Sequence, residues 1–243
     1  MSKIPTILYE DDHLIALNKP AGLLSIPDRF LTNKPNLKSL LEKKYGEIYV
    51  LHRLDHNTSG VIVFAKTAES HADLSLQIEN QKCKKEYWAL TYKPQLESGE
   101  INAPIAESLK NRGFYKVHDR GKKAISKYQT IQTWQRYALL SLELITGRTH
   151  QLRVHLKYIG APLLTDDKYS NSKEFFLSEI KRINRKREDI ERPLLKRSSL
   201  HARRFECQHP VSGETLVFLA PLFKDMKAVI SQLVKRYGDP VEL

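Results

Sequence analysis

The densest group of chemically capable side chains lies in residues 51–60, which read Leu-His-Arg-Leu-Asp-His-Asn-Thr-Ser-Gly. One carboxylate, Asp55, stands among two histidines, an arginine, an amide and two hydroxyls, immediately before an apolar run at residues 61–65. Donors of this kind can hold a carboxylate ionised and oriented, which suits a nucleophile or a base. The alternative is that Asp55 closes a turn through its own backbone, the commoner use of aspartate in such loops.

A second cluster occupies residues 146–155, which read Thr-Gly-Arg-Thr-His-Gln-Leu-Arg-Val-His. It places Arg148, Gln151 and Arg153 in the first turns of a predicted helix. Arginines are unfavourable near the positive end of a helix dipole, so their position indicates a partner elsewhere, either a phosphate or a carboxylate. An ordinary polar start of a helix is the alternative.

Several enzyme classes lose support because their motifs are missing. The sequence has no phosphate-binding Gly-x-x-x-x-Gly-Lys-Ser/Thr loop, no Gly-x-Gly-x-x-Gly, no Gly-x-Ser-x-Gly and no His-Glu-x-x-His. His52 and His56 are four residues apart, but no carboxylate pattern supports a metal there. Cys83 and Cys207 are too isolated for a disulfide framework or a thiolate zinc site. We therefore predict no metal site.

The charge balance is the first indication of a partner. The chain holds 40 Lys and Arg against 28 Asp and Glu, and 40 − 28 gives a net charge of +12. Such a surplus attracts polyanions, of which nucleic acid is the commonest in a cell, although a surplus that only serves solubility is the alternative. No run of about 18 apolar residues and no secretory signal is present. We therefore expect a cytoplasmic protein without a membrane span.

The pattern of apolar residues predicts strands mixed with helices. Strands are expected at residues 7–9, 13–18, 61–65, 87–92, 138–146, 200–207 and 215–219. Helices are expected after Pro35, after a Thr67 cap, after a Thr149 cap up to Gly160, and at the C-terminal end before Gly238. Without clear βαβ alternation, these elements predict one α+β domain over residues 1–243, built on a mostly antiparallel mixed sheet flanked by helices and loops.

A basic segment at about residues 171–197 stands apart. Residues 173–197 hold nine Lys or Arg and five Asp or Glu. Phe176, Ile180, Ile183 and Ile190 follow one another at intervals of four, three and seven residues, which predicts an amphipathic basic helix over about 173–192. This helix would either contact RNA or solvate the surface of the domain.

Several motifs together resemble the RluA family of RNA pseudouridine synthases. Residues 52–60 are similar to its His-Arg-Leu-Asp-x-x-Thr-Ser-Gly signature, and residues 18–25 resemble its opening motif. Residues 85–89 resemble its Lys-x-Tyr-x-Ala strand, and residues 147–156 its third motif, followed by Gly-Ala-Pro-Leu. The resemblance covers nearly the whole chain in order. It departs where Thr165-Asp166 stands in place of the usual Gly-Asp, and in the basic segment, which looks like an insertion.

The resemblance implies the pseudouridine synthase fold and an isomerase that converts specific uridines to pseudouridine in structured RNA. The RNA would be large-subunit rRNA, tRNA or both, as in the short members without an S4-type RNA-binding domain. The family's reaction requires no cofactor, and no obligatory protein partner is expected. Because a paired uridine is out of reach, the enzyme would flip it out of the helix.

The resemblance also assigns roles to individual residues. Asp55 would be the catalytic carboxylate, Tyr87 would stack on the flipped base, and Arg153 would pair with Asp55. Arg53 would fill the place that the base vacates. The remaining residues would serve RNA binding or the structure of the loops around the site: His52, Arg148 and Gln151.

Two other functions remain open at the level of the sequence. A non-catalytic RNA-binding or ribosome-assembly protein would use the same charge but would not need Asp55. A glycoside hydrolase would need two carboxylates across a sugar, and the motifs supply one.

Overall fold

The computed structural model describes residues 3–28, 34–182 and 190–238. The chain forms two compact units. The first unit comprises Met1–Glu86 and His201–Pro221, and the second comprises Tyr87–Leu200 and Leu222–Leu243. One domain over residues 1–243 stays a prediction.

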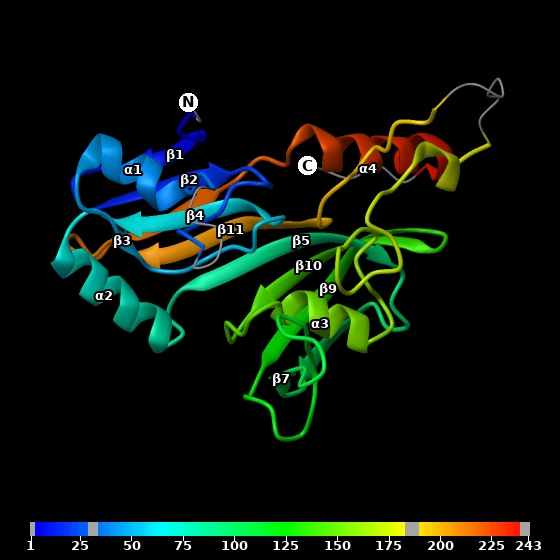
Figure 1. Cartoon of the computed structure of the whole chain (residues 1–243), viewed down its shortest axis with the longest axis horizontal. Coiled ribbons are helices and arrows are strands. Elements are labelled where there is room, and N and C mark those ends of the chain that lie inside the picture. The colour runs from blue at the N-terminus through cyan, green and yellow to red at the C-terminus, as the bar shows by residue number, and fades with distance from the viewer. Residues whose placement is uncertain (1–2, 29–33, 183–189, 239–243) are drawn as a thin grey trace. The chain divides into compact units, whose positions relative to one another are not determined.

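The first unit is built on a mixed sheet (Figure 1). Its strands are β1 (Ile7–Glu10), β2 (Leu14–Lys19), β3 (Tyr49–Val50), β4 (Ser59–Ala65), β11 (Leu200–Gln208) and β12 (Thr215–Leu219). They follow the order β1-β2-β4-β11, with β3 beside β4 and β12 beside β11. The pair β2–β4 is antiparallel and the pair β4–β11 is parallel. The strands predicted in this part of the chain are confirmed.

Two helices cover the strands of the first unit, α1 (Leu37–Tyr45) and α2 (Ala68–Glu79), and lie on opposite sides of β2 and β4 (Figure 1). Every residue of β2 and β4 is buried, which explains the apolar runs at residues 14–17 and 61–65. Thr67 caps α2 as predicted, because its hydroxyl accepts a hydrogen bond from Ser70 N at 3.2 Å.

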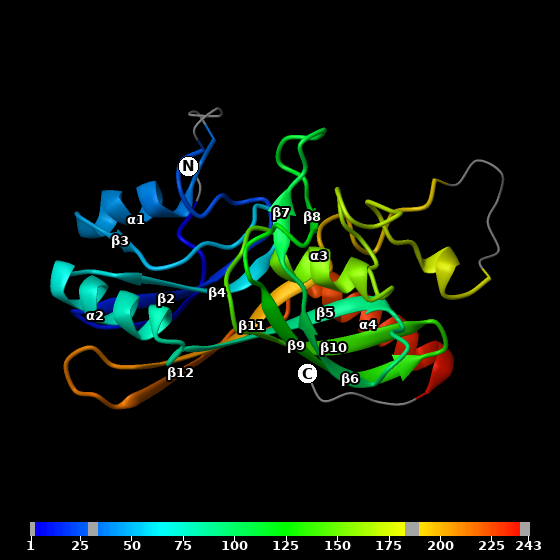
Figure 2. The same cartoon turned by 90° about the horizontal axis from the view of Figure 1, so that it is seen from below.

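The second unit contains a sheet in the order β5-β10-β9-β6 and a separate hairpin of β7 and β8 (Figure 2). The strands are β5 (Lys84–Tyr92), which begins in the first unit, β6 (Ser98–Asn102), β7 (Ile105–Glu107), β8 (Tyr115–Val117), β9 (Ile125–Trp134) and β10 (Tyr137–Leu144). The pairs β9–β10 and β6–β9 are antiparallel. The α+β class is therefore confirmed.

Strands β6 to β9 were not predicted. In β9 the large apolar residues Ile125, Tyr128, Ile131 and Trp134 recur every third residue, a spacing that does not match the alternation of a strand. Pairing with β10 along nearly its whole length determines the extended conformation of β9.

Two helices belong to the second unit, α3 (Gln151–Tyr158) and α4 (Lys224–Tyr237). Helix α3 packs against β8 and β9. Helix α4 buries the predicted stripe Met226, Val229, Ile230 and Leu233 in the core cluster that also holds Trp134 from β9.

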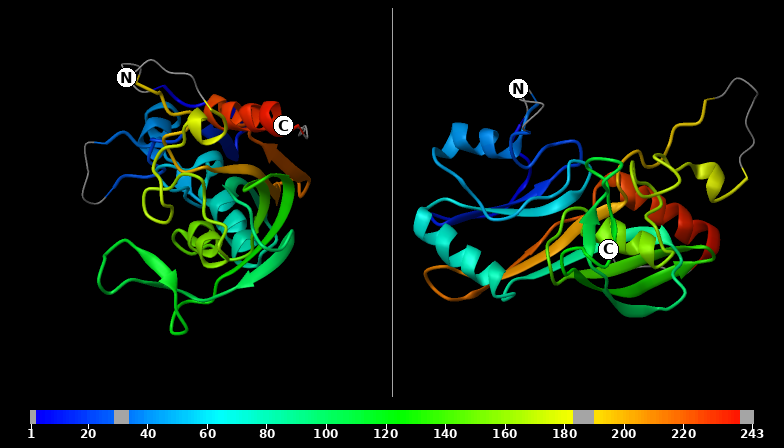
Figure 3. Two further views of the ribbon diagram at one scale, coloured as in Figure 1. Left: turned by 90° about the vertical axis from the view of Figure 1, so that its right-hand side faces the viewer. Right: turned by 60° about the horizontal axis from the view of Figure 1, so that its bottom comes forward.

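The basic segment is not the predicted α-helix. Among its described residues the only helical element is the short 3₁₀ helix η1 (Leu177–Glu179), which lies beside α4 (Figure 3). Phe175 and Leu195 form an isolated bridge and are buried in the core, while Ile190, expected on the buried stripe, is 93% exposed. The segment is thus held to the core at both ends instead of winding into one helix. Residues 183–189, with Ile183, lie outside the described residues.

Candidate active site

Asp55 occupies the first position of a tight turn that leads into β4. Thr58 N donates to Asp55 O at 3.1 Å, so the backbone turn named in the alternative interpretation is present. On the N-terminal side, Ser25 fixes the preceding residue, because its Oγ accepts from Leu54 N at 3.1 Å and donates to Leu54 O at 2.9 Å. The backbone before Asp55 is therefore held by a residue of another loop.

The backbone after Asp55 is held as firmly. Gly22 N donates to His56 O at 2.8 Å, and His56 Nε2 donates back to Gly22 O at 2.9 Å. Lys19 is fully buried, and its Nζ donates to Leu23 O at 2.8 Å, to Pro20 O at 3.0 Å and more weakly to His56 O. The loop that follows β2 thus clamps the Asp55 turn from both sides, while Asp55 itself is only half-buried.

His52 and Arg53 diverge at the start of the turn. Arg53 is exposed, whereas the ring of His52 stacks on Phe205 at 5.1 Å and its Nε2 accepts from Val63 N at 3.1 Å. Burial, together with the nearby charge of Lys85, lowers the pKa of His52 to about 3. His52 is therefore neutral at pH 7 and holds the loop to β4. Its assignment to RNA binding remains a prediction.

This low pKa makes the first unit sensitive to acid. At pH values between the ordinary pKa of about 6.5 and the pKa of the folded state, His52 is protonated in the unfolded protein but neutral in the folded one. The free energy of unfolding therefore decreases as the pH falls through this range, by at most about 1.4 kcal/mol per pH unit. In urea unfolding at pH 7, 6 and 5, His52→Gln should weaken this dependence, because glutamine accepts from Val63 N without titrating. The exposed control His118→Gln should keep the dependence of the original protein. Identical slopes for all three proteins would contradict a buried neutral His52.

The residues after the turn require close contact with β11. Ser59 Oγ donates to His201 Nδ1 at 2.8 Å, and His201 Nε2 donates to Ala220 O at 3.1 Å, all within the buried interior. Gly60 has φ +116°, and a Cβ there would lie 2.1 Å from Ala202 O. Only glycine allows this approach, so Gly60 fixes where the Asp55 turn ends.

Helix α3 is attached to β9 by two polar side chains one turn apart. Gln151 Nε2 donates to Ser126 Oγ at 2.8 Å and to Ile125 O at 2.9 Å. His155 Nδ1 accepts from the same Ser126 hydroxyl at 3.0 Å, and its Nε2 donates to Ala103 O at 2.9 Å. Gln151 is 2% exposed, and these hydrogen bonds hold the helix to β9. Its role toward RNA or the loops of the site stays a prediction.

The helix does not begin at the predicted cap. The residue before the helix is His150, in a left-handed conformation with φ +56°, and not Thr149. The side chain of Gln151 closes the preceding loop instead, because its Oε1 accepts from Arg148 N at 3.0 Å and from Thr146 Oγ1 at 2.8 Å. Gly160, with φ +73°, follows the helix end as predicted.

Arg153 points away from β9 and binds two carboxylates. Its Nε and Nη2 donate to the two oxygens of Asp166 at 2.6 and 2.7 Å, and Nη2 also donates to Asp167 at 2.6 Å. Arg153 is 5% exposed and Asp166 is 2% exposed. Although burial acts to raise the pKa of Asp166, the hydrogen bonds and charge of Arg153 hold it below its usual value. The sequence predicted a carboxylate or phosphate partner for this arginine, but did not identify Asp166.

The Thr165-Asp166 departure from the family pattern forms a well-held loop. Thr165 is fully buried, and its Oγ1 donates to Arg197 O at 2.5 Å. Its carbonyl accepts from Ser199 N at 3.1 Å. Threonine is therefore accommodated by hydrogen bonds to residues 197–199, just before β11, and Asp166 still reaches Arg153.

Tyr87 lies in β5 and is 7% exposed. Its neighbour Trp88, like Tyr92, packs against the core cluster around α4. Tyr87 is absent from that cluster, as the alternation of side chains along a strand requires.

Arg148 remains at the surface. It lines a hollow of about 480 Å³ between the β7–β8 hairpin and the loop before α3, together with the cations Arg120 and Lys122. Its Nε donates to Lys123 O at 3.0 Å. One carboxylate, Glu107, also lines the hollow, so three cations against one anion leave a positive surplus that suits an anionic ligand such as a phosphate.

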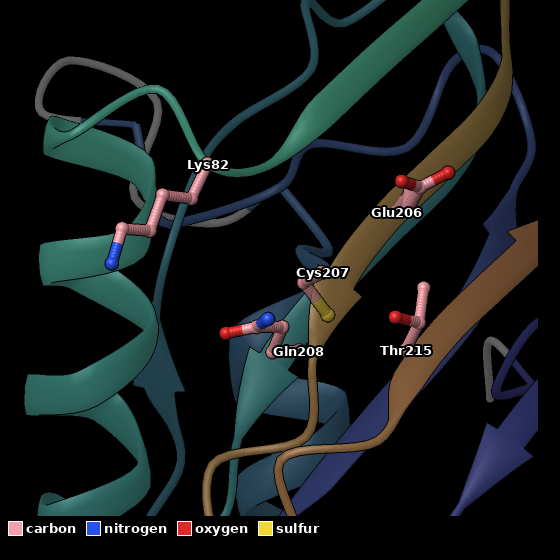
Figure 4. A pocket seen from close by; sticks show the side chains of 5 residues that line it. All are labelled: Lys82, Glu206, Cys207, Gln208 and Thr215. Atoms are coloured by element: carbon pink, nitrogen blue, oxygen red, sulfur yellow. The ribbon is translucent and has the colours of Figure 1, made fainter.

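A second hollow, of about 320 Å³, lies in the first unit and contains none of the candidate residues (Figure 4). It is lined by Lys82, Glu206, Cys207, Gln208 and Thr215. Burial raises the pKa of Cys207 to about 12, so this thiol is not a nucleophile at neutral pH.

No group of three His, Cys, Asp or Glu side chains in residues 3–28, 34–182 and 190–238 is arranged to hold a metal ion. No helix in the same ranges has the length and apolar character needed to cross a membrane.

Comparisons with known proteins agree with the motifs and the fold. A family model described as RNA pseudouridylate synthase matches residues 13–158. The chain is 33% identical to the dual-specificity RNA pseudouridine synthase RluA of Vibrio vulnificus, over 96% of this chain and 89% of that protein. It is 32% identical to the ribosomal large subunit pseudouridine synthase D of Haemophilus influenzae, over 95% of this chain and 71% of that protein.

A solved structure supports the same assignment. Human RNA pseudouridylate synthase domain containing 4 superposes with a TM-score of 0.72 at 26% identity, covering 94% of this chain and 92% of that one. The expected fold is thereby confirmed. The chain belongs to the RNA pseudouridylate synthase family.

Proposed function

We propose that this RNA pseudouridine synthase uses Asp55 as its catalytic carboxylate on uridines of structured RNA. The observation that carries the proposal is the fixed turn around Asp55, held through Leu54 by Ser25 and through His56 by Gly22 and Lys19. A reacting group must be held in its productive geometry, and backbone anchors on both sides meet that need. A protein that only binds RNA would not need a carboxylate held in this way.

The reaction is an isomerisation in which atoms balance within one nucleotide. The N1–C1′ bond of uridine breaks, C5 bonds to C1′, the proton on C5 leaves, and N1 gains a proton. We assign Tyr87 to stack on the flipped base, an interaction worth about 1–3 kcal/mol. Arg153 is assigned to pair with Asp55, and the cations around Arg148 to hold phosphates.

The proposed substrates are large-subunit rRNA and tRNA, with the cytoplasm as the place of action. The name of one relative refers to the large ribosomal subunit, and that of another to dual specificity. The net charge of +12 favours binding to either polyanion.

Tritium release tests the proposal directly. RNA carrying tritium on C5 of uridine should lose it to water when the protein is added to large-subunit rRNA or to tRNA, transcribed separately. Release from one RNA only would identify the substrate. Absence of release from both, with RNA binding intact, would support the non-catalytic RNA-binding alternative.

Arg53 should matter chiefly for paired uridines. If it fills the place of the flipped base, Arg53→Ala should lower kcat/KM about 10- to 100-fold on a stem substrate, since unstacking costs a few kcal/mol. On a matched single-stranded substrate the loss should be about threefold or less. Lys43→Ala, an exposed cation on α1, is the control and should leave both rates unchanged. Equal losses on the two substrates would refute the flipping role.

A further inference from the structure

The ring of Tyr169 lies against the guanidinium of Arg153. The Cζ atom of Arg153 is 5.0 Å from the centre of the ring, and Tyr169 is 5% exposed. A cation over an aromatic face in a desolvated place is attracted by the ring and is also restricted in its orientation. Asp166 and Asp167 bind the edge of the same guanidinium and restrict its movement within its own plane. The ring of Tyr169 lies against the face of the guanidinium and restricts its movement out of that plane.

Asp166 closes the turn that carries Tyr169. Its Oδ1 accepts from Lys168 N at 2.8 Å and from Tyr169 N at 3.0 Å, while both of its oxygens bind Arg153. The carboxylate that binds the arginine therefore also fixes the backbone of the tyrosine beneath it. The turn formed by residues 166–169 thus supplies both the carboxylates at the edge of the guanidinium and the ring on its face.

The hydroxyl of Tyr169 joins this turn to two further elements. It accepts from Tyr115 N, at the start of β8, at 2.9 Å, and is hydrogen-bonded to His150 Nδ1 at 2.8 Å. His150 is the left-handed residue directly before α3, and it precedes Arg153 by three positions. Lys168 adds a second link to the hairpin, since its Nζ donates to Gly113 O at 2.7 Å.

We propose that Tyr169 is a positioning residue for the reaction. Its ring sets the orientation of Arg153, and its hydroxyl fixes the start of α3 and of β8 relative to that ring. The two ends of one side chain thus have separable effects, one on turnover and one on the hairpin. The inference rests on the proposed function, in which Arg153 serves the reacting carboxylate.

The experiment compares Tyr169→Phe, which keeps the ring, with Tyr169→Leu, which removes it. Single-turnover rates on saturating RNA should fall at least about 30-fold for Tyr169→Leu and by about threefold or less for Tyr169→Phe, because small misplacements of a catalytic group cost up to about 100-fold. RNA affinity should change by about threefold or less in both variants. Hydrogen exchange of the Tyr115 amide should accelerate at least about tenfold in Tyr169→Phe, because its acceptor is lost.

Tyr158→Leu, an exposed tyrosine at the end of α3, is the matched control and should change none of these measurements. Equal rate losses for Tyr169→Phe and Tyr169→Leu would overturn the role of the ring, and unchanged Tyr115 exchange in Tyr169→Phe would overturn that of the hydroxyl. If Tyr169→Leu does not fold, Tyr169→Phe still decides: a loss of turnover beyond about 30-fold contradicts the proposal. Failure of the original protein to release tritium would instead refute the proposed function, while the exchange measurement would remain valid.

Discussion

Replacing Asp55 with asparagine is expected to abolish turnover while leaving RNA binding nearly intact. The amide preserves the shape of the side chain and removes its charge, and the backbone anchors at Leu54 and His56 do not involve the carboxylate. We expect tritium release below about one thousandth of the original rate, since loss of a catalytic group commonly has effects of this order. The RNA dissociation constant, measured by filter binding, should change by about threefold or less.

The matched control is Asp12→Asn, which changes an exposed aspartate in the turn before β2. It alters the net charge by the same amount, and its rate should equal that of the original protein. Turnover of a few per cent in Asp55→Asn, after mass spectrometry has excluded deamidation, would show that Asp55 is not the reacting group.

Arg153→Ala is expected to destabilise the second unit as well as to stop turnover. Removing the guanidinium leaves Asp166, whose side chain is fully buried, without its cation. Breaking a buried pair in this way costs about 3–5 kcal/mol. Urea unfolding should show this loss, and tritium release should fall to background. Lys157→Ala, an exposed cation on the same helix, should alter stability by less than about 0.5 kcal/mol.

A double variant separates the two effects of Arg153. Adding Asp166→Asn to Arg153→Ala removes the stranded charge, so about 1–3 kcal/mol of the lost stability should return. Turnover should not return, because the cation assigned to Asp55 is still missing. Recovery of tritium release in the double variant would show that Arg153 acts only through the stability of the fold.

The sequence determined the features that depend on neighbours along the chain. The pattern of apolar residues predicted β2 and β4, and the Thr67 cap and the Gly160 end of a helix were predicted from single residues. Asp55 was singled out for the same reason, since a polar cluster directly before a buried strand is visible without any tertiary contact, while its catalytic role comes from the family resemblance and stays a proposal. These signals are local, because side-chain periodicity and capping act over a few residues.

Only the tertiary structure decided which partner each polar residue has. From the sequence alone, the polar side chains at the start of α3 could face either RNA or the interior. In the structure, Gln151 faces the interior, because its amide donates to Ser126. Arg153 meets Asp166 because the loop after α3 returns to it. The apolar stripe of the basic segment suggested a helix, but Phe175 and Leu195 bind the segment to the core instead. A local sequence pattern indicates whether a segment is a helix or a strand. The partners of its polar side chains lie on segments distant in the sequence, which come together only in the folded protein.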